Sequence, residues 1–210
     1  MKLYYYILLI TLIFFNCKEI NKNIEQNETE YYYPSNESFN PQIQEKPINI
    51  DSIENFGKLL TVTEKISCED QLPIIRINNK NTIFNFKIFK DCPDAMDVID
   101  YKQRNIVLIQ GDSIIVNVLI SKPFDSLKKV LSNHLLNNGS SPNYSISLDK
   151  ALFMYHQDST YDSKKVKEHF IKLASVFNEV NSENGDSLEL KIKLIEYPFT
   201  RIPIPQLPIE

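Results

Sequence analysis

The most informative stretch of this sequence is NIVLIQ at residues 105–110, followed by Gly111-Asp112 and by SIIVNVLI at residues 113–120. Both flanking runs are rich in Ile and Val, which favour extended strands. A Gly-Asp pair between two such runs is typical of a tight hairpin turn. The stretch therefore predicts an antiparallel pair of strands, 105–110 and 113–120.

Helical and strand patterns alternate after this hairpin. Pro123 stands where the first turn of a helix tolerates proline, and apolar residues then recur at helical spacing until the breaker Asn137–Pro142. Residues 144–155 read as a strand, and residues 166–180 carry one apolar helical stripe. Residues 188–194 alternate Leu or Ile with Glu or Lys, which predicts a strand with one wet face.

The expected order from residue 104 to residue 196 is therefore β-β-α-β-α-β. Each helix has to bury an apolar stripe, and the simplest surface on which both can do so is one face of the same sheet. We therefore expect the α+β class, as a two-layer sandwich in which a mixed sheet carries two helices on one face.

Residues 51–103 predict a separate subregion that contains a helix and a hairpin. Asp51-Ser52 precedes apolar residues at helical spacing, which suggests a capped helix of about three turns that Gly57 weakens. Two β-rich runs, 74–77 and 82–89, flank the Asn-rich residues 78–81, and this arrangement signals a hairpin. On its second strand, side-chain alternation puts three apolar residues on one face: Phe84, Phe86 and Ile88.

The composition excludes several classes of function. The chain has 210 residues, with 23 Lys and Arg against 27 Asp and Glu, for a net charge of −4. These values suit one soluble domain with a real core plus some dispensable sequence. A nucleic-acid partner is not expected, because such binders carry a basic surface. With 4 Gly and no glycine-rich phosphate motif, the chain is expected to bind no cofactor.

The N-terminus is expected to direct the chain to the cell envelope. Lys2 precedes a largely apolar run from Leu3 to Phe15, too short for a bilayer span and typical of a signal peptide. LIFFNC at residues 12–17 resembles a bacterial lipoprotein lipobox, although Phe14 and Asn16 depart from the usual residues. We therefore expect a signal peptide over residues 1–16 and acyl chains on Cys17. The alternative is an ordinary signal peptide that is cut elsewhere.

The regions that flank the predicted domain are expected to be extended. Residues 17–50 are polar and contain several prolines without apolar periodicity, which predicts a flexible tether. Its exception, Tyr31-Tyr32-Tyr33, is interpreted either as a docking patch or as a short edge strand or plain linker. Residues 197–210 contain four prolines and predict an extended tail that serves as an arm on a partner.

Export also bears on the two remaining cysteines, Cys68 and Cys92. In an oxidising compartment, pairing is the default, so we expect a structural disulfide between them. No C-x-x-C motif supports a redox role, and two cysteines without a nearby His pair make a poor zinc site. No metal site is therefore expected.

Several of these patterns resemble one known family. The hairpin 105–116, the helical run 124–131 and the stretch from Ser145 through Tyr161 to Val166 together resemble the periplasmic domain of the ExbD/TolR family, in its Bacteroidota branch. The resemblance covers roughly residues 104–200, and Asp149 and Tyr161 match the family pattern. Members are subunits of proton-driven inner-membrane motors that energise outer-membrane transport or envelope integrity.

Those motors act through a transmembrane helix that bears an essential Asp. The apolar run 3–15 is short and has no acid, so the resemblance implies no proton-driven role here. It implies instead a periplasmic interaction or dimerisation module. For Asp149 and Tyr161, the structural alternatives are the end of a strand and a staple at the start of a helix.

The three histidines give weak support for an enzyme. His134 and His169 border the apolar stripes of their helices. His156 and Asp158 lie in a loop that also leads to Tyr161, and a His and an acid two residues apart are able to bind a metal or share a proton. No diagnostic catalytic spacing accompanies them, and helix capping explains the loop with fewer assumptions. These three residues are kept as a candidate interaction loop, with no catalytic residue assigned.

The sequence as a whole favours a lipid-anchored envelope lipoprotein. We expect it on the periplasmic side of the outer membrane, with surface exposure as the alternative. It would act as a non-catalytic protein-binding or scaffold module, accessory to energy-transducing transport, with an envelope protein or a second copy of itself as partner. The alternative is a small periplasmic hydrolase or ligand- or metal-binding protein built on the loop around His156.

Overall fold

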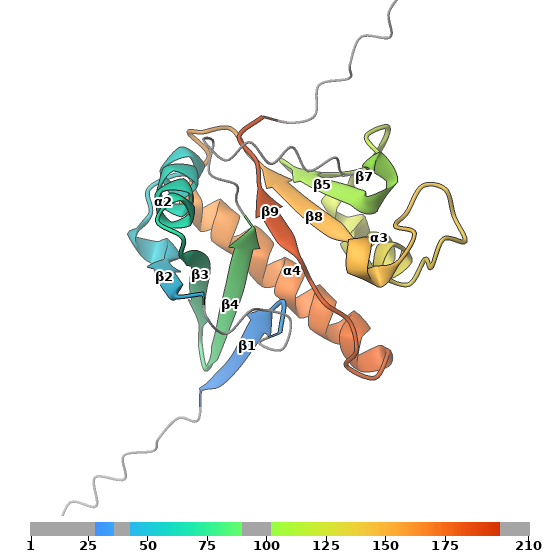
Figure 1. Ribbon diagram of the computed structural model, residues 1–210, viewed down its shortest axis with the longest axis horizontal. Helices are drawn as coiled ribbons and strands as arrows, with labels where there is room; N and C mark the ends of the chain where they lie inside the picture. The colour runs from blue at the N-terminus through green and yellow to red at the C-terminus, as the bar shows by residue number, and fades with distance from the viewer. Residues whose placement is uncertain (1–27, 36–42, 90–101, 198–210) are drawn as a thin grey trace, which may run out of the picture.

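The computed structural model describes residues 28–35, 43–89 and 102–197 (Figure 1). Nine strands in this part of the chain form one sheet, in the order β2-β3-β4-β9-β8-β5-β6-β7, with β1 also paired to β4. The strands are β1 (Thr29–Tyr33), β2 (Glu45–Asn49), β3 (Leu72–Asn79), β4 (Thr82–Phe89), β5 (Ile106–Gln110), β6 (Ser113–Val116), β7 (Ile120–Pro123), β8 (Leu152–His156) and β9 (Ile192–Leu194). The α-helices in the same part are α2 (Phe56–Cys68), α3 (Leu127–Leu135) and α4 (Ser163–Glu183).

The sheet is mixed, with a parallel middle between two antiparallel pairings. Strands β4, β9, β8 and β5 run in the same direction, whereas β3–β4 and β5–β6–β7 are antiparallel. Ile88 on β4 pairs with Ile192 on β9, so residues 51–103 and 104–196 contribute strands to one continuous sheet. The two predicted subregions therefore share a single β-sheet layer.

All three helices bury their apolar stripes against one face of that sheet. α4 crosses behind the strands in Figure 1 and packs beside α3 and α2. Phe170 on α4 meets Phe86 on β4 edge-to-face at 4.8 Å, and Phe56 on α2 meets Tyr155 on β8 at 5.6 Å. The expected α+β arrangement of a mixed sheet with helices on one face is confirmed.

The opposite face of the sheet is covered by no described helix and carries a smaller apolar cluster. Its buried members are Ile106 and Leu108 on β5 and Leu152 and Met154 on β8. The same face holds Lys87, 1% exposed, whose Nζ lies 2.9 Å from the Glu45 carboxylate. We call these the covered face and the open face.

Three predicted strands differ from those observed. The strand expected over 113–120 breaks at residues 117–119, where Asn117 and Val118 have φ near +50° and +60°, and the chain folds back as β7. Residues 144–151 are irregular, so only Leu152–His156 of that prediction is strand. β9 is limited to Ile192–Leu194 and is buried throughout, so the expected wet face was wrong at Lys193.

The first helix begins later than predicted. Asp51 and Ser52 lie in a separate 3-10 turn, and Asn55 caps α2 by accepting a hydrogen bond from the Lys58 backbone N–H at 2.9 Å. Gly57 permits a close approach here, because a Cβ at this position would lie 3.0 Å from the backbone oxygen of Ser159. The glycine that weakened the helical pattern therefore lets the first turn of α2 contact the β8–α4 loop.

Part of the predicted tether belongs to the sheet. β1 pairs in parallel with β4, and β2 pairs in parallel with β3. Tyr33 is buried, stacks on Phe86 at 4.9 Å and donates a hydrogen bond to Asn178 Oδ1 at 2.8 Å. The tyrosine cluster is therefore a strand rather than a free docking patch. The sequence did not predict this strand, because its residues are partly polar and its partner strand lies tens of residues away along the chain.

None of the helices in residues 28–35, 43–89 and 102–197 combines the length and apolarity needed to cross a bilayer. The signal peptide, Cys17 and the proline-rich tail beyond Tyr197 lie outside the described residues. Their predicted roles therefore stay predictions.

Candidate functional site

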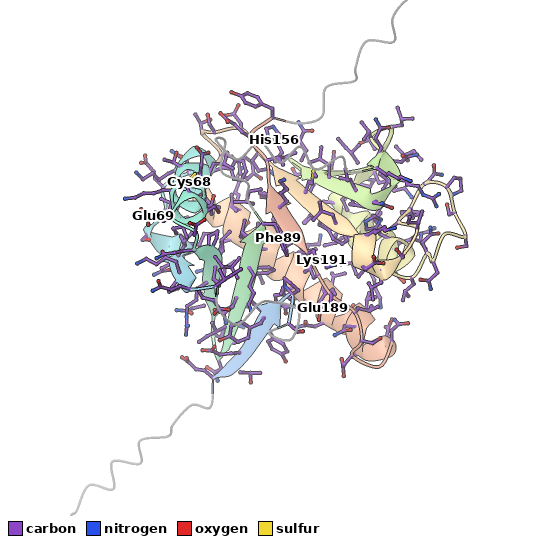
Figure 2. The ribbon with its side chains drawn as sticks, viewed as in Figure 1. Cys68, Glu69, Phe89, His156, Glu189 and Lys191 are labelled. Carbon is purple, nitrogen blue, oxygen red and sulfur yellow. The ribbon has the colours of Figure 1, made fainter. Side chains whose placement is uncertain are left out.

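The loop that follows β8 contains the three candidate residues, and His156 stands at its start. Its Nδ1 lies 3.2 Å from the backbone oxygen of Ile195, and its ring meets Phe56 edge-to-face at 6.4 Å. Figure 2 labels His156 at the carboxyl end of β8, beside the end of β9. The imidazole thus links the end of β8 to the residue after β9.

Asp158 and Tyr161 shape the entry into α4. The Asp158 carboxylate accepts hydrogen bonds from the backbone N–H of Thr160 at 2.9 Å and from its hydroxyl at 2.7 Å, and these bonds lower the pKa of Asp158. The backbone oxygen of Tyr161 accepts a hydrogen bond from the N–H of Phe56 at 2.9 Å. Asp162 then caps α4 through the N–H of Lys164. Tyr161 thus takes part in the entry into α4 through its backbone oxygen.

The three side chains do not converge on a common point. The Tyr161 ring lies 6.0 Å from the ring of His169, whereas His156 contacts Phe56 and Ile195. No group of three or more His, Cys, Asp or Glu side chains able to hold a metal ion occurs among the described residues. The second acid or histidine that a hydrolytic or metal site would need beside His156 is not provided there.

A chain of polar contacts that sequence reasoning missed joins Tyr155, His169 and Asp112. The Tyr155 hydroxyl lies 3.0 Å from His169 Nδ1, and His169 Nε2 lies 3.6 Å from the Asp112 carboxylate. Burial lowers the pKa of His169 and raises that of Tyr155. Neutral His169 is therefore placed to accept from Tyr155 and to direct its Nε2–H toward Asp112. The three residues are distant from one another in sequence, so no sequence motif predicts their contacts.

We interpret the Tyr155–His169–Asp112 chain as structural rather than catalytic. Tyr155 is 1% exposed, and the ring of Phe124 packs against His169 at 4.7 Å. Gln157 Oε1 also accepts from the backbone N–H of Gly111 at 3.0 Å. Together these contacts hold the β5–β6 turn against β8 and α4.

His134 is the most deeply buried of the histidines. It is 0% exposed on α3, with the rings of Phe153 and Tyr144 against it. Its Nδ1 accepts from the backbone N–H of Ser145 at 3.4 Å. Burial lowers its pKa to about 4, so the imidazole is neutral near pH 7. This position makes His134 a core residue that fixes the loop after α3.

β2 and β7, at the two ends of the main strand order, differ in the aliphatic side chains that they expose. β2 carries Pro47 in its middle and exposed charges at Glu45 and Lys46, and β7 likewise carries Lys122 and Pro123, so proline and lysine limit strand pairing on both. β7 begins with Ile120, 37% exposed, directly after Leu119, 64% exposed, whereas Ile48 of β2 is buried. The β7 edge is therefore the candidate interaction surface.

The cysteines are placed only in part. Cys68 ends α2, is exposed and is disulfide-bonded. Cys92, its predicted partner, lies outside the described residues, as does Cys17. The pairing of Cys68 with Cys92 and the lipidation of Cys17 therefore stay predictions.

The chain was also compared with known proteins. It matches no protein-family model, no curated protein and no solved structure.

Proposed function

We propose that this protein is a lipid-anchored envelope lipoprotein that acts as a non-catalytic protein-binding module, and that it takes a partner strand on the β7 edge. The single observation that carries the binding role is the pair of exposed aliphatic side chains, Leu119 and Ile120, at the start of the β7 edge. The anchor rests on the signal-like run 3–15 and on Cys17. The resemblance to the ExbD/TolR periplasmic domain suggests a role accessory to energy-transducing transport.

The register of β7 identifies the backbone groups that face outward. The N–H of Phe124 donates to the oxygen of Asp112 at 2.9 Å, and the same ladder pairs Ile114 with Lys122. Hydrogen-bonded pairs alternate with non-bonded pairs along an antiparallel ladder, so the N–H and C=O of Ser121 point away from β6. Pro123 adds an outward carbonyl but no N–H. Ser121 is thus the residue whose backbone a new strand would engage.

Exposed apolar side chains accompany that backbone edge. Leu119 directly precedes β7, and Ile120 is its first residue. Strand addition obtains its affinity from main-chain hydrogen bonds and its specificity from side chains beside the edge. Leu119 and Ile120 would supply this apolar contact.

The geometry favours this role over the hydrolase alternative. A catalytic loop needs a nucleophile or metal within reach of a base and a place for substrate. His156, Asp158 and Tyr161 instead make separate contacts to Ile195, Thr160 and Phe56. The β7 edge needs no rearrangement to accept a strand.

Photo-crosslinking in living cells tests the edge. A benzophenone amino acid in place of Leu119 should yield a discrete adduct with an envelope protein or a second copy of this chain. Adding Ser121→Pro should reduce that adduct roughly fivefold or more, because it removes the outward N–H and leaves the β6 ladder intact. Ser121→Ala, which keeps the N–H, is the matched control. Equal capture by Ser121→Pro and Ser121→Ala would overturn the proposal, as would the absence of any discrete adduct.

Fractionation tests the anchor independently. Cys17→Ser should move the protein from the membrane to the soluble periplasmic fraction, because it removes the sulfur that carries the acyl chains. Mass spectrometry of the unmodified protein should find acyl chains on Cys17. Membrane association that survives Cys17→Ser would contradict lipidation as the anchor.

A further inference from the structure

A cavity of about 400 Å³ opens near the start of β8, on the open face of the sheet. Its apolar wall consists of Phe89 at the end of β4, Ile146, Ala151 and Leu152. Leu152 belongs to the small apolar cluster of the open face, which places the cavity on the side away from the helices. Figure 2 labels Phe89 and Lys191 close together over the middle of the sheet.

The walls of this cavity are held in place by buried hydrogen bonds. Asn105, 6% exposed, lines it and accepts hydrogen bonds at Oδ1 from the backbone N–H of Ile146 at 3.2 Å and from Ser145 Oγ at 3.3 Å. Arg104 adds bonds to the backbone oxygens of Tyr144 and Ser141. The loop that supplies Ile146 is therefore preformed.

The rim of the cavity is positive. Three lysines line it, Lys102, Lys150 and Lys191, together with one acid, Asp149. A hydrogen bond from Ser147 and then the nearby lysines lower the pKa of Asp149, so its carboxylate is ionised. Lys191 Nζ donates to the backbone oxygen of Asp149 at 2.7 Å, which directs that ammonium along the rim. Because three lysines and one aspartate line the rim, the net charge there favours binding of an anionic ligand.

We propose that this cavity binds a single-chain amphiphile with a carboxylate head, of the fatty-acid class. The apolar wall would take the hydrocarbon chain, and the ammonium groups of Lys102 and Lys150 would pair with the carboxylate. The volume lies within the range of about 300–1,000 Å³ that is typical of small-molecule sites. The site is separate from the β7 edge and does not depend on the strand-addition proposal.

The contributions of the alkyl chain and of the head group to the affinity can be tested separately. Each methylene that the cavity buries should tighten binding by up to about fourfold until the cavity is full. The carboxylate should contribute through ion pairs with exposed lysines, so the affinity should fall as salt is raised. A neutral alcohol of the same chain length should bind more weakly than the acid.

Isothermal titration of the mature Cys17→Ser protein with octanoate, decanoate and dodecanoate, each below its micelle concentration, tests the proposal. We expect saturable one-to-one binding that strengthens with chain length, and weaker binding of dodecanol. The double variant Lys102→Gln/Lys150→Gln should weaken dodecanoate binding roughly fivefold or more. Lys129→Gln/Lys164→Gln, which removes the same charge from exposed helix positions, is the matched control.

A second variant addresses the apolar wall. Ile146→Trp should fill the cavity and abolish dodecanoate binding while the lysines stay in place, and thermal unfolding would check that this variant folds. If it does not fold, the lysine pair and the dodecanol comparison decide by themselves. The proposal would be overturned by the absence of saturable binding, by equal affinity for dodecanol and dodecanoate, or by equal weakening in the two double-lysine variants.

Discussion

The two faces of the sheet are built from different kinds of contact. On the covered face, aromatic rings from strands and helices interlock, as where Phe86 lies between Tyr33 at 4.9 Å and Phe170 at 4.8 Å. On the open face, a small aliphatic cluster lies beside the Lys87–Glu45 ion pair and the lysine-rimmed cavity. Aromatic packing is therefore concentrated on the covered face, whereas the open face combines buried aliphatic and charged side chains with a cavity.

This difference has a physical origin in the helices. A sheet face that packs on helices loses its contact with water, so each apolar side chain there contributes hydrophobic free energy. On the face without described helices, polar and charged groups are buried with partners, as Lys87 is with Glu45. Three predictions test whether the two faces differ in this way.

The largest expected effect follows from truncating the aromatic core. Phe86→Ala should lower the free energy of unfolding by about 3–5 kcal/mol, because it leaves a cavity among packed rings. Met154→Ala on the open face should cost about 2 kcal/mol, since fewer packed groups surround it. Urea unfolding of the two variants measures both losses. A loss for Met154→Ala that equals or exceeds that for Phe86→Ala would remove the distinction between the faces.

Acid should weaken the covered face through its buried histidines. The pKa of His134 lies near 4 in the folded chain and near 6.5 when unfolded, so the unfolded state binds more protons between these values. The stabilisation is complete above about pH 6.5 and is lost as the pH falls toward 4, by on the order of 2–3 kcal/mol. Unfolding free energies measured across this range should show that slope.

Substitutions locate the source of the pH dependence. His134→Gln should flatten the slope, because it removes the titrating imidazole. Some slope should remain in that variant, since burial also lowers the pKa of His169. An unchanged slope in His134→Gln would show that His134 is not the source.

The smallest effect is expected at the ion pair of the open face. Glu45→Gln should cost about 1 kcal/mol, because Lys87 is buried whereas Glu45 is 43% exposed and screened by water. The loss should shrink as salt is raised, whereas the loss in Phe86→Ala should not. Thermal unfolding at low and high salt distinguishes the two behaviours, and a salt-independent loss at Glu45 would count against an electrostatic origin.

The candidate loop shows where sequence reasoning about function reached its limit. His156, Asp158 and Tyr161 were grouped because they follow one strand within a few residues. In the structure, these residues contact Ile195, Thr160 and Phe56, respectively, and those partners lie on different elements. The spacing along the chain predicted a loop, but it gave no information about where the contacts of these residues are made.

The edge and the cavity were harder to predict. β7 was not predicted as a separate strand, because the turn at Asn117-Val118 that precedes it carries no glycine. The cavity draws residues from 89 to 191, so no local pattern describes it. Asp149 was singled out through a family pattern and lies on the cavity rim.

Local pattern was enough to establish the α+β class, the β3–β4 and β5–β6 hairpins and the buried stripe of α4. Periodicity reports which side of an element faces the core, and a hairpin pairs residues that are close in sequence. The tertiary structure alone decided that β1 and β2 join the sheet, that β4 pairs with β9, and that the described helices pack on one face. Parallel pairing between distant strands leaves no local signature, because its hydrogen bonds form only after the intervening chain has folded.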